Sequence, residues 1–175
     1  MDSQPPSRLE QAKALRGQGR LQDSERMLKS EVAEPAASSE AHLLLGHVLF
    51  DQGSIPEAHA AYEEAVRRDP SDSVCRLHLG RTHAAMWRQE DATVEYRRAI
   101  ELDPDSNRAR QILGQTLFNM GRRDEAVAVF QEWLDREPDH PTATHLLAAW
   151  QGERLPRASD DYLRAVFDRF ADKFD

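Results

Sequence analysis

Hydrophobic residues recur along the chain at intervals of three and four positions, the spacing of helices that bury one face. In residues 56–68, for example, Ala58, Tyr62 and Ala65 stand at i, i+4 and i+7, on one stripe of a helix. A lone helix hairpin has nothing against which to bury such a stripe. The pattern therefore predicts an all-α protein in which each hairpin is covered by its neighbour.

The same pattern of residues recurs at a fixed period, since the step from Gly46 to Gly80 equals the step from Gly80 to Gly114. Other residue types keep this step: Leu45, Leu79 and Leu113; Ala58, Ala92 and Ala126; Tyr62, Tyr96 and Phe130; and Pro70, Pro104 and Pro138. A period of this length with two helices in each unit predicts a solenoid of stacked helix hairpins.

These residues resemble the tetratricopeptide repeat (TPR) family, whose repeat has a Leu-Gly pair, an Ala-x-x-x-aromatic-x-x-Ala run and a closing Pro. The first copy consists of Leu45-Gly46, Ala58, Tyr62, Ala65 and Pro70, and two further copies follow in register. The resemblance implies a right-handed α-solenoid with one degenerate, three full and one partial repeat. Trp133 departs from the pattern, because it replaces the small residue found at Ala65 and Ala99, and we expect it to change the approach of the next helix.

The predicted solenoid occupies residues 1–151, with full repeats at about 39–72, 73–106 and 107–140. Their first helices are predicted at Ser39–Asp51, Ser73–Met86 and Asn107–Met120, and their second helices at Pro56–Arg68, Glu90–Glu101 and Asp124–Arg136. A degenerate repeat precedes them at Ser7–Arg16 and Leu21–Val32, and a single further helix follows at Thr142–Gln151.

Glycine and proline positions add detail to the predicted hairpins. Gly46, Gly80 and Gly114 each cost about 1 kcal/mol relative to Ala inside a helix, so their return in every repeat predicts close helix packing at these points. Gly53 and Gly121 are predicted turn residues, although the middle repeat has Trp87 at this position. Pro70, Pro104 and Pro138 are expected to end the second helices, because the residue before a Pro avoids the α conformation.

The composition and net charge of the chain argue against some classes of binding partner. The net charge is −8, from 31 acidic and 23 basic residues, which argues against a nucleic-acid partner or an anionic membrane surface. Cys75 is the only cysteine, so no internal disulfide can form, and we interpret it as a small core residue. The N-terminus does not have the pattern of a secretory signal, and no apolar run is long enough to cross a membrane. We expect a soluble cytoplasmic protein.

The sequence offers no motif for catalysis, and we predict no cofactor and no metal. The eight glycines lie in repeat turns, packing positions or the stretch after the last predicted solenoid helix, rather than in a turn that follows a strand. The pairs His42/His47 and His78/His83 are five residues apart, which does not place two ligands on one helix face. We interpret these histidines as residues of helix surfaces or of a groove.

The family resemblance also implies a binding site, because TPR proteins bind extended peptides on the concave face lined by their first helices. Carried over by register, this groove consists of His47, Phe50, His78, Arg81, Arg108, Gln111, Gln115, Phe118 and Asn119. Arg and amide side chains can hold a carboxylate or a peptide backbone, and a Phe ring can receive an apolar side chain. The alternative at each position is an ordinary solvated helix residue.

One known use of this groove is disfavoured. Co-chaperones of the family grip the C-terminal carboxylate of heat-shock chaperones with Lys and Asn residues at set positions. In this chain Leu43, His47, His78 and Ile112 occupy four of those positions, and only Arg108 matches in character.

The C-terminal part of the sequence leaves two functions open. Residues 152–158 read as a linker and residues 159–175 as an amphipathic helix whose stripe contains Leu163, Val166, Phe167 and Phe170. This helix is expected to cap the solenoid or to mediate self-association. Residues 158–175 also resemble the joint in bacterial TPR-fused S-adenosylmethionine-dependent methyltransferases. The leading hypothesis is a non-catalytic scaffold that binds a protein or peptide. The alternative is the recognition domain of such a methyltransferase, whose catalytic domain this sequence does not contain.

Overall fold

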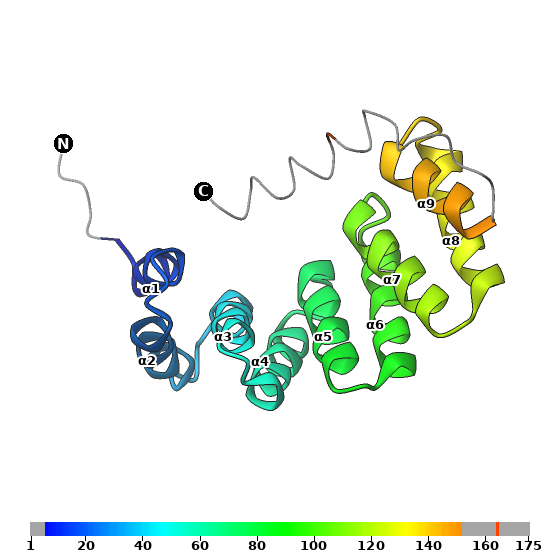
Figure 1. The fold of residues 1–175 in the computed structure, drawn as a ribbon. Coiled ribbons are helices and arrows are strands. Elements are labelled where there is room, and N and C mark those ends of the chain that lie inside the picture. The colour runs from blue at the N-terminus through cyan, green and yellow to red at the C-terminus, as the bar shows by residue number, and fades with distance from the viewer. Residues whose placement is uncertain (1–5, 152–163, 165–175) are drawn as a thin grey trace. The chain divides into compact units, whose positions relative to one another are not determined.

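A computed structural model describes residues 6–151 and residue 164 (Figure 1). The described ranges contain helices and turns but no strand, which confirms the predicted all-α class. The helices are α1 (Arg8–Gly17), α2 (Leu21–Val32), α3 (Ser39–Asp51), α4 (Ile55–Arg68), α5 (Ser73–Ala85), α6 (Gln89–Leu102), α7 (Asn107–Asn119), α8 (Arg123–Arg136) and α9 (Pro141–Gln151). The predicted linker at 152–158 and the predicted helix at 159–175 lie outside the described residues, apart from Arg164.

The helices fall into two compact units, unit 1 up to Pro104 and unit 2 from Asp105 onward. Unit 1 contains three hairpins, and each stacks on the next because α2 packs against α3 and α4 packs against α5. Its first helices α1, α3 and α5 form one layer, and α2, α4 and α6 form the other (Figure 1). In unit 2, α8 packs against both α7 and α9.

Local hydrogen bonds explain where the helices begin. Ser7 forms a capping box with Glu10 at the start of α1, and the Ser38 hydroxyl accepts a hydrogen bond from the Ala41 N–H at the start of α3. The Asp72 carboxylate accepts from the N–H groups of Val74 and Cys75 and caps α5. These side chains satisfy backbone donors that a helix leaves unpaired in its first turn.

The packing glycines have the role that their period predicted. A Cβ at Gly46 would lie 2.5 Å from Cε1 of Tyr62, and a Cβ at Gly80 would lie 2.6 Å from Cε1 of Tyr96. Gly114 stands against the ring of Phe130 in the same way. In each repeat the aromatic side chain of the second helix therefore lies directly on the glycine of the first helix, where no side chain would fit.

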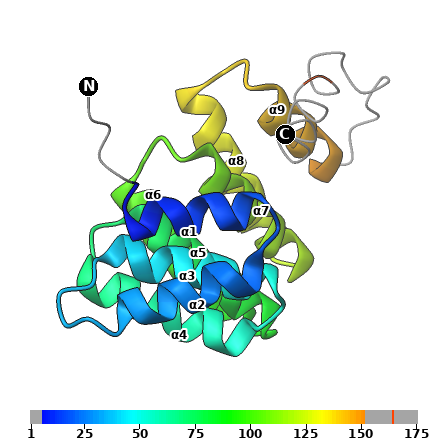
Figure 2. The same ribbon diagram turned by 90° about the vertical axis from the view of Figure 1, so that its left-hand side faces the viewer.

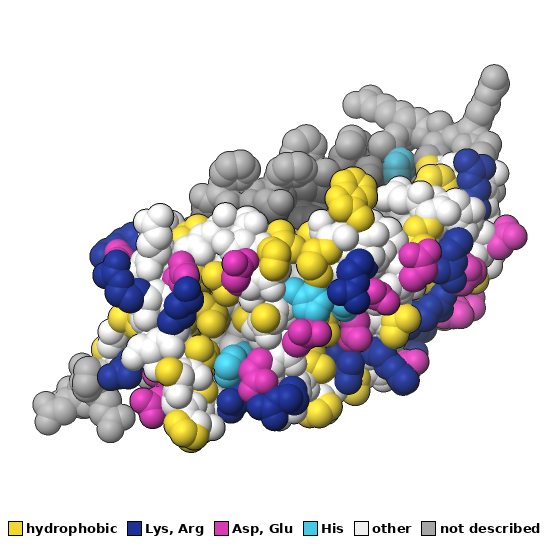
Figure 3. All heavy atoms as spheres, turned by 90° about the horizontal axis from the view of Figure 1, so that it is seen from below, with side chains coloured by type: hydrophobic (Ala, Val, Ile, Leu, Met, Phe, Trp, Pro, Cys, Tyr) yellow, Lys and Arg dark blue, Asp and Glu magenta, His cyan; other side chains and the backbone are white. Residues whose placement is uncertain are grey.

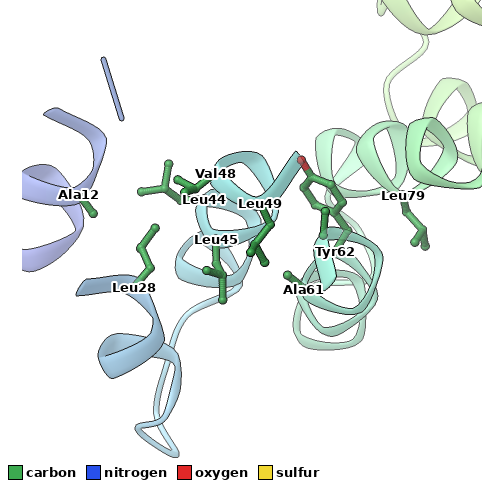
Figure 4. Packing of buried hydrophobic residues seen from close by; sticks show 10 residues of the cluster. Ala12, Leu28, Leu44, Leu45, Val48, Leu49, Ala61, Tyr62 and Leu79 are labelled. Atoms are coloured by element: carbon green, nitrogen blue, oxygen red, sulfur yellow. The ribbon is translucent and has the colours of Figure 1, made fainter. Parts of the chain in front are cut away.

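The core of unit 1 continues from one hairpin to the next. Leu28 on α2 is fully buried and belongs to the same cluster as Leu44 and Val48 on α3 (Figure 4). On the far side of α3, Leu49 lies near Tyr62 of α4, and the cluster extends to Leu79 of α5. A stripe that one hairpin cannot bury alone is thus covered by its neighbour, as expected for a helical repeat.

In unit 2, Trp133 is buried at the end of α8, with 1% of its surface exposed. Its ring centroid lies 5.4 Å from that of Phe130 and 4.3 Å from that of His140, which directly precedes α9. The large ring thus fills a position that is occupied by buried alanines in α4 and α6.

The surface of the described chain has mixed charge. On the face seen in Figure 3, Lys and Arg side chains alternate with Asp and Glu side chains. Several charged side chains of the described residues pair along one helix, as in Arg98 with Glu101 at 2.7 Å. None of the described helices combines the length and the apolar character that a membrane span requires.

Candidate functional site

Four of the predicted groove residues come together in unit 1. His47 and Phe50 lie on α3, and His78 and Arg81 lie one repeat later on α5. The ring centroids of His47 and His78 are 4.3 Å apart, and the guanidinium carbon of Arg81 lies 4.9 Å from the centroid of the Phe50 ring. All four side chains are half-buried. We call these four residues the α3–α5 cluster.

The Arg81 side chain is held by two contacts. Its Nη1 lies 3.2 Å from Nδ1 of His78, and since a guanidinium can only donate, Nδ1 is the acceptor. The neutral His78 ring therefore carries its proton on Nε2. The second contact is the cation–π interaction with Phe50, which favours a guanidinium over the face of the ring.

Tyr62 of α4 packs against the α3–α5 cluster, a contact that the sequence did not predict. Its ring stacks on His78 with centroids 5.5 Å apart and an interplanar angle of 24°, and the His47 ring meets it edge-on at 5.7 Å. Burial raises the pKa of the Tyr62 phenol, so the ring is neutral. The repeat period marks Tyr62 as a packing residue, but nothing in that period shows that His78 lies against it.

The charge of Arg81 has no acidic counterpart in this part of the structure. Among the described residues, Arg81 forms no ion pair with a carboxylate, whereas Arg76 on the same helix pairs with Glu95 at 3.1 Å. A half-buried, oriented guanidinium without a carboxylate partner can bind a carboxylate of a ligand, to which it donates charge-assisted hydrogen bonds.

The other five predicted groove residues lie on α7 in unit 2. Arg108, Gln115 and Asn119 are exposed, and Gln111 is half-buried. Phe118 is engaged within the unit, because its ring stacks on that of Trp150 of α9 with centroids 4.7 Å apart and an interplanar angle of 13°. The guanidinium carbon of Arg123 lies 5.4 Å from the centroid of the same ring. Phe118 thus helps to hold α9, a contact that the repeat pattern did not reveal.

The expectation that the histidines lie on helix surfaces or in a groove is wrong for His42 and His83, which are both buried. His59 is buried as well. The rings of His59 and His83 meet edge-on with centroids 4.6 Å apart, between α4 and α5. Burial, with smaller contributions from His59 and Arg88, lowers the pKa of His83. Within the described ranges, no group of three or more His, Cys, Asp or Glu side chains could hold a metal ion.

Cys75 is a core residue, as its place in the repeat predicted. Its side chain is fully buried, and burial raises the pKa of the thiol to about 12. The Sγ atom lies 3.2 Å from a carboxylate oxygen of Asp72, a neighbour that further disfavours the thiolate. The chemistry of an activated cysteine, which requires a lowered pKa, is therefore not available here.

Hairpins that repeat at a fixed period and stack on their neighbours define a helical-repeat protein. The sequence matches the tetratricopeptide repeat family over residues 9–73 and again over residues 88–149. The chain is built from tetratricopeptide repeats, which confirms that part of the resemblance, while the resemblance to a methyltransferase joint is not shown. None of the curated proteins compared with the chain matches it.

Solved structures share the fold. A crystal structure of MamA has a TM-score of 0.71 and 27% sequence identity, covering 75% of this chain and 77% of MamA. YrrB, described as a TPR protein with an unusual peptide-binding site, has a TM-score of 0.68 and 22% identity, with 84% and 77% covered. The first TPR of Spaghetti (RPAP3), bound to the HSP90 peptide SRMEEVD, has a TM-score of 0.58 and 21% identity, with 66% and 94% covered.

Proposed function

We propose that the protein is a non-catalytic interaction module whose unit 1 binds an extended segment of a partner protein across α3 and α5. The α3–α5 cluster makes the specific contact, and Arg81 receives an acidic side chain of that segment. One observation carries the proposal: Arg81 is held in place by Phe50 and His78, yet it forms no ion pair with a carboxylate of the described residues.

The chemistry of the cluster fits such a ligand. The guanidinium of Arg81 offers several donors to a carboxylate. The exposed portions of Phe50 and His47 provide apolar surface for the stem of the bound side chain. Two proteins of the same fold, YrrB and RPAP3, are described by their peptide binding, which supports a peptide as the class of ligand.

Unit 2 by itself carries, on its helix α7, a separate set of candidate contact residues. Arg108, Gln115 and Asn119 are exposed on α7 and can donate hydrogen bonds to the backbone or side chains of a partner. Phe118 and Gln111 are less accessible, and we assign them a supporting role. The methyltransferase alternative depends on residues 158–175, of which the structure describes only Arg164, and it stays a prediction.

The proposal is tested with labelled peptides of one fixed frame whose central residue is Glu, Gln or Lys, measured by fluorescence anisotropy. The Glu peptide should bind best to the wild-type protein. Arg81→Met keeps an apolar stem over Phe50 but removes the charge, and it should weaken binding of the Glu peptide about tenfold to a hundredfold, the value of one charged hydrogen-bond contact.

The matched control is Arg98→Met, which removes one positive charge from α6, where Arg98 is exposed and pairs with Glu101. This variant should bind the Glu peptide as the wild type does. Equal binding of all three peptides, or equal losses for the two variants, would show that Arg81 does not select an acidic ligand.

A further inference from the structure

Trp87 occupies a turn position at which the other repeats have glycine. From one repeat to the next, this position holds Gly19, Gly53, Trp87 and Gly121. The three glycines have φ of 74°, 81° and 78°, and Trp87 has φ of 62°. A large side chain in this left-handed region is strained, because its Cβ crowds the backbone carbonyl oxygen that follows it. The turn itself therefore gives no reason for a tryptophan.

Packing gives no reason either. Trp87 is 87% exposed, compared with 55% for Val94, the next most exposed large hydrophobic residue described. At the three glycines, an added Cβ would meet no atom within 4 Å, so this turn position faces open space. A strained and solvated indole is costly to the free chain, and Trp is among the residues most enriched at the energetic centres of protein interfaces.

The opposite end of unit 1 carries a hollow that is large enough to admit an indole. Figure 2 looks onto this end, where α1 and α2 face the viewer with no earlier described hairpin covering them. The hollow has a volume of about 720 Å³, and Ala14, Leu15 and Met27 give it apolar surface. Three arginines, Arg8, Arg20 and Arg26, stand around that surface.

The charge of the hollow is positive. Asp23 is the acidic residue among its lining, and it pairs with Arg20 at 2.7 Å and more distantly with Arg26 at 3.8 Å. Arg26 is 82% exposed, and Arg8, which lies 4.0 Å from a carboxylate oxygen of Glu31, is 63% exposed, so both guanidinium groups can move onto a bound ring. Arginine over the face of Trp is the most favourable protein cation–π pair.

We propose that Trp87 of one copy of the chain inserts into the α1–α2 hollow of a second copy. The indole lies on Leu15 and Met27 and is covered by an arginine. Asp91 on the first turn of α6 is paired with Arg88 at 2.8 Å, so Glu90 is the acidic residue of that turn that approaches the basic rim of the hollow. The cation–π pairing, the apolar floor of the hollow and the contact of Glu90 with its basic rim favour this occupant.

The two surfaces differ, so the contact is heterologous and each copy in a pair keeps one unused surface. One copy cannot fill its own hollow through this contact, because hairpin α3–α4 separates α1–α2 from the turn at Trp87 (Figure 1). A single aromatic anchor buries little area compared with a stable dimer, so the association is weak and depends on concentration.

Sedimentation velocity over a range of concentrations tests the proposal. The wild type should shift to larger species as its concentration rises. Trp87→Gly restores the residue of the other turns, so it should fold and remain monomeric. The double variant Arg8→Glu with Arg26→Glu reverses the charge at the rim of the hollow and should also remain monomeric. A matched double reversal, Arg67→Glu with Arg98→Glu, should associate as the wild type does.

Mixing the variants gives the sharpest outcome. Trp87→Gly keeps the hollow and the rim variant keeps Trp87, so the mixture should form a heterodimer that grows no further. A monomeric wild type at all concentrations, undiminished association of Trp87→Gly, or a mixture without a heterodimer would each overturn the proposal.

Discussion

At the scale of single residues, the helical glycines occupy two kinds of position, one closed and one open. Gly80 is closed, because Cε1 of Tyr96 and the carbonyl oxygen of Ala92 would lie 2.6 Å and 3.2 Å from an added Cβ. Gly17, at the end of α1, is open, since a Cβ there would meet nothing within 4 Å. The same residue type is thus required at one position and replaceable at another.

Gly80→Ala should lower the free energy of unfolding by about 1–3 kcal/mol, the usual cost of overpacking a core. Gly17→Ala is the control, and it should be neutral or stabilise the protein by up to about 1 kcal/mol, because Ala restricts the unfolded chain. Chemical denaturation of both variants measures the two changes. Equal effects would show that the ring of Tyr96 moves aside freely.

At the scale of helices, the contact between α4 and α5 contains a buried pair of histidines. His83 on α5 meets His59 on α4 with ring centroids 4.6 Å apart, and Nδ1 of His59 lies 3.5 Å from a Glu63 carboxylate oxygen. Burial, His59 and Arg88 lower the pKa of His83, and the carboxylates of Asp91 and Glu95 oppose this shift. The balance favours the neutral ring in the folded state.

The lowered pKa predicts a loss of stability in acid. The unfolded chain takes up a proton at His83 near the ordinary value of 6.5, whereas the folded chain takes it up only at lower pH. The free energy of unfolding should therefore fall as the pH drops below about 6.5 and level off below the pKa of the folded state. Denaturant midpoints measured across this window check the sign.

The control is His83→Gln, which cannot take up this proton and should show a smaller fall over the same window. If the wild type and this variant lose stability equally between neutral and mildly acidic pH, His83 does not carry the effect.

The sequence predicted much at the scale of helices and little about how side chains meet between repeats. The bounds of α2 and α3 agree with their predicted bounds, since caps, prolines and the apolar stripe act within one segment. The pairing of Arg81 with Phe50 depends on the rotation between successive hairpins, which a period does not specify. The burial of His83 was missed for the same reason.

At the scale of the whole molecule, a net charge of −8 disfavours acidic ligands at long range. At physiological ionic strength, charges more than about 8 Å apart are largely screened, so in the proposed binding mode the short-range contact with Arg81 decides whether a carboxylate binds. The repeat scaffold supplies this contact by placing α3 and α5 side by side in one layer (Figure 1). The proposed recognition is therefore local, although the fold that positions it is shared by the family.

Mapping of the binding site by NMR tests this claim most directly. Titration of the isotope-labelled protein with the Glu-centred peptide should move the signals of His47, Phe50, His78 and Arg81. Signals of the opposite layer, such as those of Arg67 on α4 and Arg98 on α6, should stay in place. Changes concentrated on that opposite layer, with the α3–α5 cluster unaffected, would contradict the account.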